Sequence, residues 1–176
     1  MYGGDRWVSS NLMRSTYIWL PLTLSGTTAS MKNMVNWVPS TWSAGPSENS
    51  YEGESATYSS GAKTVSCSGC SGSNAAGYIG GSSNGAVQFA SVQSSASTRT
   101  TIRIKHENGD SSQRYADVSV NGGASQRIAF LPSTDGNTPA SSSVHVNLNS
   151  GTNTVRISRS DGGNGPDVDR IMVPQS

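Results

Sequence analysis

The stretch Val144-His145-Val146-Asn147-Leu148-Asn149-Ser150-Gly151-Thr152-Asn153-Thr154-Val155-Arg156-Ile157 decides the fold. Apolar and polar residues alternate on both sides of Asn149-Ser150-Gly151, a group of turn-forming residues. Such alternation places the apolar side chains of each strand on one face of a sheet. The stretch therefore predicts two antiparallel strands, each with one buried face.

The same period-two pattern recurs in the rest of the C-terminal three quarters of the chain. Further short strands are predicted around Val87 and Phe89, Ile102 and Ile104, Ala116, Val118 and Val120, and Ile171 and Val173. Turn signals separate them at Asn84-Gly85, Asn108-Gly109-Asp110, Asn121-Gly122-Gly123, Asp135-Gly136-Asn137 and Asp161-Gly162-Gly163. Many short strands with turns between them indicate an all-β fold, an antiparallel sandwich or jelly roll.

Composition narrows the possible partners. Of 176 residues, 12 are basic and 11 acidic, so the near-neutral charge gives no reason to expect nucleic acid or an acidic membrane surface as a partner. No stretch approaches the roughly 20 apolar residues that span a bilayer. We therefore expect neither a nucleic-acid partner nor a membrane segment.

Residues 1–45 and 46–176 differ in chemistry and are predicted to be separate parts. All four tryptophans lie before residue 43, and Asp5 is the only carboxylate before Glu48. Residues 17–24 predict one strand and residues 34–38 a second. Two or three strands are too few to fold independently, so this segment is expected to be the end of a larger sheet structure.

Paired acidic residues occur near both ends of the second part. Glu52 and Glu54 are two apart, as are Asp167 and Asp169. The first and last strands of a sandwich often lie side by side, which would bring these carboxylates together. Such a cluster suits Ca²⁺, which prefers hard oxygen ligands. Ordinary solvated acids fit the spacing equally well. A glycosidase pair is a third interpretation, but it requires an apolar pocket that the sequence does not indicate.

The two cysteines stand close together in Cys67-Ser68-Gly69-Cys70. This spacing suggests redox chemistry in a cytosolic βαβ protein. Here it lies among Ser and Gly with no helix-forming sequence after it, which favours a local structural disulfide. A disulfide implies an oxidising compartment, so we expect a secreted protein.

Aromatic rings that could stack on a sugar are few after residue 42. Tyr78 stands out because glycines flank it in Ala76-Gly77-Tyr78-Ile79-Gly80-Gly81, which leaves room for a ligand; packing within the fold is the alternative. Phe89 and Phe130 belong to core patterns. His106 and His145 are placed at polar strand positions, and no nucleophilic triad is evident.

Five motifs together resemble family 35 carbohydrate-binding modules over about 130 residues: Tyr51-Glu52-Gly53-Glu54, Cys67-Ser68-Gly69-Cys70-Ser71-Gly72, Gly77-Tyr78-Ile79-Gly80-Gly81, Asp117-Val118-Ser119-Val120-Asn121-Gly122-Gly123 and Gly165-Pro166-Asp167-Val168-Asp169-Arg170-Ile171. The resemblance implies a β-jelly-roll with a structural Ca²⁺ held by Glu52, Glu54 and Asp169. It also implies a sugar site in loops at one end of the sandwich, formed by Gly77, Tyr78, Arg114, Asp135, Asn137, Asp161 and Asn164.

One departure from that family concerns a loop that carries tryptophan in many relatives. Here the loop, residues 131–139, has none. Recognition should then depend more on hydrogen bonds, which fits a small site for a chain end better than a long groove.

The first segment resembles the final strands of a family 43 glycoside hydrolase, a five-bladed β-propeller. The resemblance lies in Gly4-Asp5-Arg6-Trp7, residues 17–22 and Trp37-Val38-Pro39. Within that family it is most similar to fungal exo-β-1,3-galactanases, which join a propeller to a family 35 module. The family's catalytic carboxylates have no counterpart here, so we expect no catalytic residue and a chain that is part of a longer secreted galactanase.

The leading expectation is a monomeric, calcium-stabilised module that binds the terminal galactose of β-1,3-galactan and anchors an enzyme to its substrate. The alternatives are binding of another plant polysaccharide, an adhesion domain without a sugar site, and an active hydrolase.

Overall fold

The computed structural model of the chain describes residues 1–135 and 137–175. They form two compact units, Met1–Ser47 and Glu48–Ser176. The division falls within three residues of the boundary expected from composition. No helix among the described residues is long and apolar enough to cross a bilayer.

The N-terminal unit contains three small two-stranded antiparallel sheets. Their strands are β1 (Tyr2–Arg6) with β2 (Thr16–Leu20), β3 (Leu22–Ser25) with β4 (Thr28–Met31), and β5 (Trp37–Val38) with β6 (Ser43–Ala44). A 3₁₀ turn, η1 (Leu12–Arg14), lies between β1 and β2. The prediction of one strand over residues 17–24 is wrong, because the chain breaks at Pro21 and its halves pair with different partners. Proline has no N–H to donate to a sheet.

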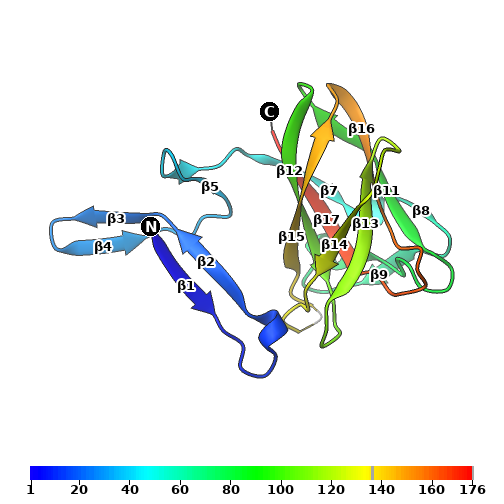
Figure 1. The fold of residues 1–176 in the computed structure, drawn as a ribbon, viewed down its shortest axis with the longest axis horizontal. Coiled ribbons are helices and arrows are strands. Elements are labelled where there is room, and N and C mark those ends of the chain that lie inside the picture. The colour runs from blue at the N-terminus through cyan, green and yellow to red at the C-terminus, as the bar shows by residue number, and fades with distance from the viewer. Residues whose placement is uncertain (136, 176) are drawn as a thin grey trace. The chain divides into compact units, whose positions relative to one another are not determined.

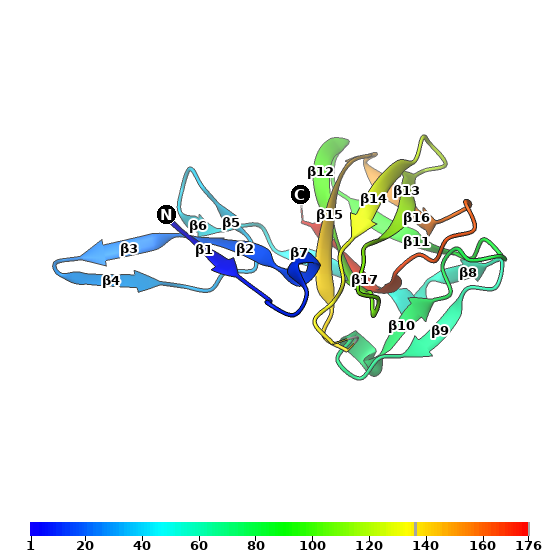
Figure 2. The same ribbon diagram turned by 60° about the horizontal axis from the view of Figure 1, so that its bottom comes forward.

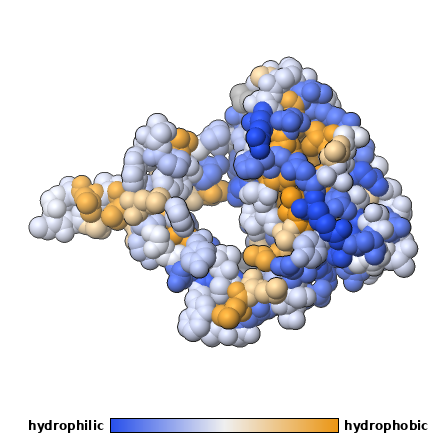
Figure 3. All heavy atoms as spheres, viewed as in Figure 1, coloured by the Kyte–Doolittle hydropathy of each residue, from blue (hydrophilic) through white to orange (hydrophobic). Residues whose placement is uncertain are grey.

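Much of the apolar surface of this unit is exposed. Trp7, Tyr17, Trp19 and Leu24 are all at least 60% exposed. Figure 3 shows apolar residues on the surface of the hairpin formed by β3 and β4. The Trp37 indole N–H donates to the carbonyl of Trp19 at 2.8 Å, and the Trp37 and Trp42 rings are 5.8 Å apart. Within the described residues, little of the unit's aromatic surface is buried by the unit itself.

The C-terminal unit is a sandwich of two antiparallel sheets (Figures 1 and 2). The first sheet contains β7 (Glu48–Glu52), β9 (Lys63–Ser66), β10 (Asn74–Gly77), β12 (Thr98–Glu107), β15 (Ala140–Leu148) and β17 (Asp167–Pro174). The second contains β8 (Thr57–Ser59), β11 (Ala86–Ser94), β13 (Arg114–Val120), β14 (Gln126–Phe130) and β16 (Gly151–Ser158). Two 3₁₀ turns, η2 (Gly53–Ser55) and η3 (Ser71–Ser73), complete it. The predicted all-β sandwich is confirmed.

The core lies between the two sheets and uses the alternating apolar residues that predicted the strands. Ile102 and Ile104 from β12 and Val155 and Ile157 from β16 are fully buried there. Phe130 is also in the core, and the His106 ring meets its ring edge-on at 4.9 Å. The placement of His106 at a polar position was therefore wrong. His106 lies an even number of residues from Ile102 and Ile104 on β12, so its side chain points to the same, buried face. Its position in the strand, and not its polar side chain, decides its burial.

Strand β17 has three partner strands in the first sheet. It pairs with β12 on one side and with both β7 and β10 on the other. The register of β7 and β17 places Glu52 opposite Arg170 and Tyr51 opposite Ile171. The expectation that the first and last strands of the sandwich lie side by side is confirmed, and this pairing places Glu52 beside β17.

We expect residues 46–176 to fold when produced without residues 1–45, because the core described above is built within Glu48–Ser176. The shortened chain should show a cooperative thermal transition by circular dichroism, with a melting temperature close to that of the full chain. A shortened chain that is unfolded at 25 °C would place the boundary elsewhere.

Candidate functional sites

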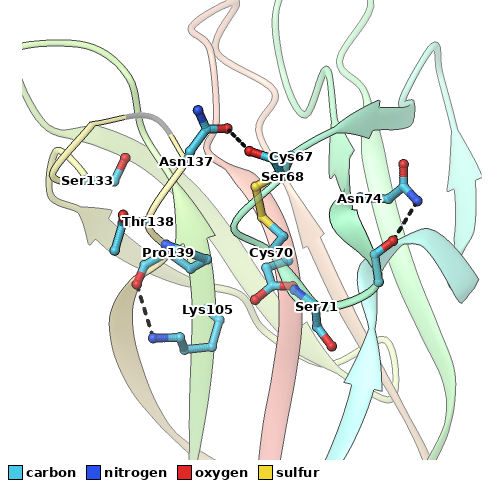
Figure 4. Close-up of a disulfide and its surroundings, with 12 residues drawn as sticks. Cys67, Ser68, Cys70, Ser71, Asn74, Lys105, Ser133, Asn137, Thr138 and Pro139 are labelled. Atoms are coloured by element: carbon cyan, nitrogen blue, oxygen red, sulfur yellow. Dashed lines mark hydrogen bonds between the residues drawn. A yellow bond between two sulfur atoms is a disulfide. The ribbon is translucent and has the colours of Figure 1, made fainter.

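The cysteines form the disulfide that the sequence predicts, Cys67–Cys70, in the loop between β9 and β10. The loop is tightly closed: Cys70 N–H donates to Cys67 O at 3.1 Å, and Cys67 N–H donates to Ser73 O at 3.0 Å. Both cysteines are buried. The Ser68 hydroxyl donates to Asn137 Oδ1 at 3.3 Å, so the loop between β14 and β15 lies against the disulfide loop (Figure 4).

Backbone packing brings Glu52, Glu54 and Asp169 together. Glu52 ends β7 beside β17, and η2 then carries Glu54. Gly53 makes this turn possible, because a Cβ there would overlap the Val168 carbonyl oxygen of β17. The spacing of Glu52 and Glu54 had suggested that both lie on a strand, but Glu54 lies in the turn η2. Its charge nevertheless acts on Asp169.

Each of these three side chains has one buried oxygen without a hydrogen bond: Glu52 Oε2, Glu54 Oε2 and Asp169 Oδ2. Asp169 is fully buried, and its other oxygen accepts from the Ser71 N–H at 2.9 Å. Burial raises the pKa of Asp169, the Arg170 guanidinium at 3.8 Å opposes that shift, and the charges of Glu52 and Glu54 add to it. Buried carboxylate oxygens without hydrogen bonds are the kind of donor that a hard cation such as Ca²⁺ binds. Among the described residues, however, the acids and cysteines whose ligand atoms lie within 4.8 Å of one another are Cys67, Cys70 and Glu107, and not these three.

Glu107 is buried as Asp169 is, and the sequence analysis missed it. It is 4% exposed, neither oxygen accepts a hydrogen bond, and its carboxylate lies within 4.8 Å of both disulfide sulfurs. Burial raises its pKa; the nearby Ser133 hydroxyl opposes the shift, and Asp135, Asp169 and Asp167 add to it. Glu107 points to the same, outer face of the sheet as Lys105 and Arg103, which are two and four residues before it on β12. Its burial comes from the disulfide loop that covers this end of the sheet's outer face, which alternation alone does not reveal.

Tyr78 stands at the other end of the β9–β10 hairpin from the disulfide. The hairpin register pairs Asn74 with Ser66 at the disulfide end and Gly77 with Lys63 at the Tyr78 end. Tyr78 adopts a positive φ of 59° and its side chain is 61% exposed. The Lys63 ammonium lies 4.3 Å from the centre of its ring, a cation–π contact that orients the ring.

Tyr78 forms one wall of an open hollow of about 290 Å³, here called the arginine hollow. Its other main lining residues are Val65, Arg114, Asn164, Gly165 and Asp167. The Arg114 guanidinium donates to both carboxylate oxygens of Asp110, at 2.7 and 3.0 Å, and to Gly165 O at 3.1 Å. A guanidinium has five N–H groups, so two remain to donate to a ligand.

The partly buried carboxyl of Asp167 supplies an acceptor in the arginine hollow. Burial raises its pKa, while Arg114 and the backbone N–H of Tyr78 oppose the shift. One aromatic ring with donors and an acceptor beside it is the arrangement that can cover a sugar's C–H face and hydrogen-bond its hydroxyls.

The structure brings only part of the predicted sugar-binding set to this hollow. Tyr78, Arg114 and Asn164 line it, and Gly77 is the buried residue before Tyr78. Asp161 instead forms ion pairs with Arg127 and Arg159, which hold its pKa far below its usual value. No contact of Asp161 with the hollow is seen among the described residues.

Asp135 and Asn137 lie elsewhere, in the loop against the disulfide. Asp135 accepts the N–H groups of Asn137 and Thr138 at 2.9 and 2.7 Å, so its carboxylate shapes the loop. Pro139 in the same loop accepts from the Lys105 ammonium at 3.1 Å (Figure 4). A role for Asp135, Asn137 or Asp161 in sugar binding stays a prediction.

Comparison with known proteins identifies relatives. Residues 86–173 match a protein-family model described as "CBM13-like: Alpha-galactosidase, CBM13 domain". No curated protein matches the chain. Among solved structures, an exo-β-1,3-galactanase from Phanerochaete chrysosporium in complex with β-1,3-galactotriose is 36% identical, with a TM-score of 0.79 over 98% of this chain. This chain spans 40% of the galactanase chain.

A family 35 carbohydrate-binding module from Clostridium thermocellum is 29% identical, with a TM-score of 0.67, over 72% of this chain and 98% of the module. The family 35 module of Paenibacillus barcinonensis, at 24% identity and a TM-score of 0.63, has the same fold. The family model and the two family 35 modules carry different family numbers, but each names a carbohydrate-binding domain. The resemblance to an exo-β-1,3-galactanase and to family 35 modules is confirmed.

Glu107→Gln tests the buried acid. A raised pKa means that the folded protein holds this proton more tightly than the unfolded chain, so ionisation removes stability as the pH rises above the ordinary value of 4.5. Glutamine mimics the protonated form. We expect parent and variant to melt alike below that pH in calcium-free buffer, and the variant to melt at the higher temperature at neutral pH. A variant that is less stable than its parent at pH 7 would contradict this account.

Proposed function

Because the chain belongs to the CBM13-like family of carbohydrate-binding domains, we propose that it binds the terminal galactose of β-1,3-galactan and holds a galactanase on that substrate. The observation that carries the proposal is the exposed Tyr78 ring beside Arg114 and Asn164 in the arginine hollow. The similar galactanase, with β-1,3-galactotriose bound, supports galactan as the ligand class.

The shape of the hollow supports recognition of a chain end. Small-molecule sites occupy about 300–1,000 Å³, so a hollow of about 290 Å³ suits a single sugar unit. Tyr78 contributes the one exposed aromatic surface there, while Arg114, Asn164 and Asp167 contribute polar groups. Binding of another plant polysaccharide is the alternative that the same chemistry allows.

We propose that Ca²⁺ binds at Glu52, Glu54 and Asp169 and stabilises the module. The three buried oxygens without hydrogen bonds support this, because a cation would offset both their desolvation and their mutual repulsion. In this role the ion joins β7 and η2 to β17 and takes no part in chemistry.

The rest of the proposal concerns the parent protein. We propose that catalysis belongs to a glycoside hydrolase domain outside this chain, since glycoside hydrolysis needs a pair of carboxylates and Asp5 is the only one before Glu48. We further propose a secreted, monomeric module. The disulfide supports secretion, because such bonds persist in oxidising compartments.

Removing calcium should lower the melting temperature of the chain. A ligand at a hundredfold excess over its Kd stabilises a protein by about 2.7 kcal/mol. We expect EDTA to remove stabilisation of this order, as measured by differential scanning fluorimetry, and added Ca²⁺ to restore it. Asp169→Asn serves as the matched control and should no longer respond to either treatment. An identical melting temperature with and without EDTA would exclude the site.

Tyr78→Ala should sharply weaken galactan binding and leave the fold intact. Burial of apolar surface contributes about 25 cal/mol per Å², so loss of one ring contact costs one or more kcal/mol, or roughly tenfold in affinity. Binding is measured by affinity electrophoresis in β-1,3-galactan. Tyr17→Ala is the matched control, since Tyr17 is also strongly exposed, at 78%, and lies outside the module. Unchanged binding by a folded Tyr78→Ala variant would rule out the arginine hollow.

A tyrosine within the module would be a poorer control, as Tyr58 illustrates. Its hydroxyl donates to Gly53 O at 3.0 Å and also contacts the Thr64 hydroxyl, so it supports the turn that carries Glu54.

A further inference from the structure

Tyr78 also borders a second hollow, here called the serine hollow. It has a volume of about 230 Å³ and shares Tyr78 and Asn164 with the arginine hollow. Its remaining wall is formed chiefly by Gly80, Gly81, Ser82 and Ser83. Two adjoining hollows therefore meet at one exposed aromatic ring.

The floor of the serine hollow is fixed backbone. Gly80 forms β-bridges with Gly85 and with Asn164, and Gly81 N–H donates to Gly163 O at 2.9 Å. Gly80 and Gly81 have φ values of 78° and 65°, and a Cβ at Gly80 would overlap the Gly163 carbonyl. Glycine is needed at Gly80 for both reasons. The hollow is thus a built feature of the fold, held in place by hydrogen bonds across two loops.

Polar groups that face this hollow have no partner within the described part of the chain. Asn84 N–H donates to Gly81 O at 3.1 Å and closes a tight turn whose central residues are Ser82 and Ser83. No hydrogen bond involves the Ser82 or Ser83 hydroxyl or the Asn164 side-chain amide, among residues 1–135 and 137–175. The Asn164 amide oxygen would lie 3.4 Å from a Cβ on Gly81, so the amide reaches the serine hollow.

The chemistry of the two hollows differs. The arginine hollow contains the charged groups of Arg114 and Asp167, whereas no charged side chain lines the serine hollow. Hydroxyl and amide groups with both donor and acceptor capacity suit a neutral, hydroxyl-rich ligand. At about 230 Å³, the serine hollow is smaller than the roughly 300 Å³ at which ordinary small-molecule sites begin, so it holds at most one sugar unit.

We propose that the serine hollow is a second sugar subsite, which takes the unit linked to the terminal galactose in the arginine hollow. The ligand then passes the Tyr78 ring, which borders both hollows, and only the ring face away from the Lys63 ammonium is open to stacking. This inference rests on the proposed function, because it requires that the arginine hollow holds the terminal sugar. It makes a disaccharide, and not a single galactose, the unit that the module recognises.

The experiment compares galactose with β-1,3-galactobiose by isothermal titration calorimetry on the full chain. We expect galactobiose to bind about tenfold more tightly, equivalent to roughly two ordinary hydrogen bonds. Ser83→Leu fills the serine hollow from an exposed position and should abolish this gain while leaving galactose binding unchanged. The double variant Ser82→Ala with Ser83→Ala removes the hydroxyls without filling the space and should reduce the gain. Ser91→Leu, exposed on β11 outside both hollows, is the matched control and should keep the full gain.

The outcomes separate the two proposals. If galactose binds but galactobiose binds no more tightly, the proposed function stands and the second subsite is overturned. A gain that persists in Ser83→Leu would also overturn it, since the second unit must then lie elsewhere. If neither sugar binds to the parent chain, the proposed function fails and the subsite fails with it.

Discussion

The pairing of β17 with its three neighbours is the constraint on which both sites depend. β17 holds β12 on one edge and β7 and β10 on the other, and it contributes an acid to each site. Asp169 joins Glu52 and Glu54, while Asp167, two residues earlier, lines the arginine hollow. Between them Val168 points into the core. A shift of one residue in this register would move both acids into the core and Val168 out of it, so the apolar packing of β17 also fixes the positions of the two carboxyls.

Alternation predicted the long strands of the sandwich because their outer faces are polar and their inner faces apolar. Alternation failed where another segment of the chain, such as the disulfide loop, covers the outer face of the sheet. Residues of β10 are buried on both faces, and Glu107 on β12 is buried under the disulfide loop, so neither shows the pattern of a half-exposed strand. In the N-terminal unit the apolar pattern continues through Pro21 although the strand does not. Periodicity indicates which residues share a face, but not what covers that face.

The candidate sites were predictable to different degrees for related reasons. Glu52, Glu54 and Asp169 come together through strand pairing, which sequence order suggests. Tyr78 and Asn164 lie in loops and Arg114 begins β13, and only the resemblance to known modules indicated that they come together. Asp161 shows why loop residues are difficult to place, since two arginines from different segments bind its carboxylate. A polar side chain in a loop can bind a ligand or pair with another side chain of the protein. Which of the two occurs depends on the three-dimensional geometry, and the sequence alone does not reveal it.

A shallow hollow with one aromatic ring gains affinity mainly if its groups are already in place, because ordering side chains on binding costs free energy. The arginine hollow meets that condition. Lys63 holds the Tyr78 ring, Asp110 and Gly165 hold Arg114, and the bridge to Gly80 holds the backbone of Asn164. The ordering cost is therefore largely incurred on folding, and each contact with a sugar can contribute more of its free energy to binding. The same reasoning explains Gly80 and Gly81, which follow Tyr78 closely in the sequence. They let the backbones of neighbouring loop segments approach closely enough to form hydrogen bonds, and those hydrogen bonds hold the loops in place around the ring.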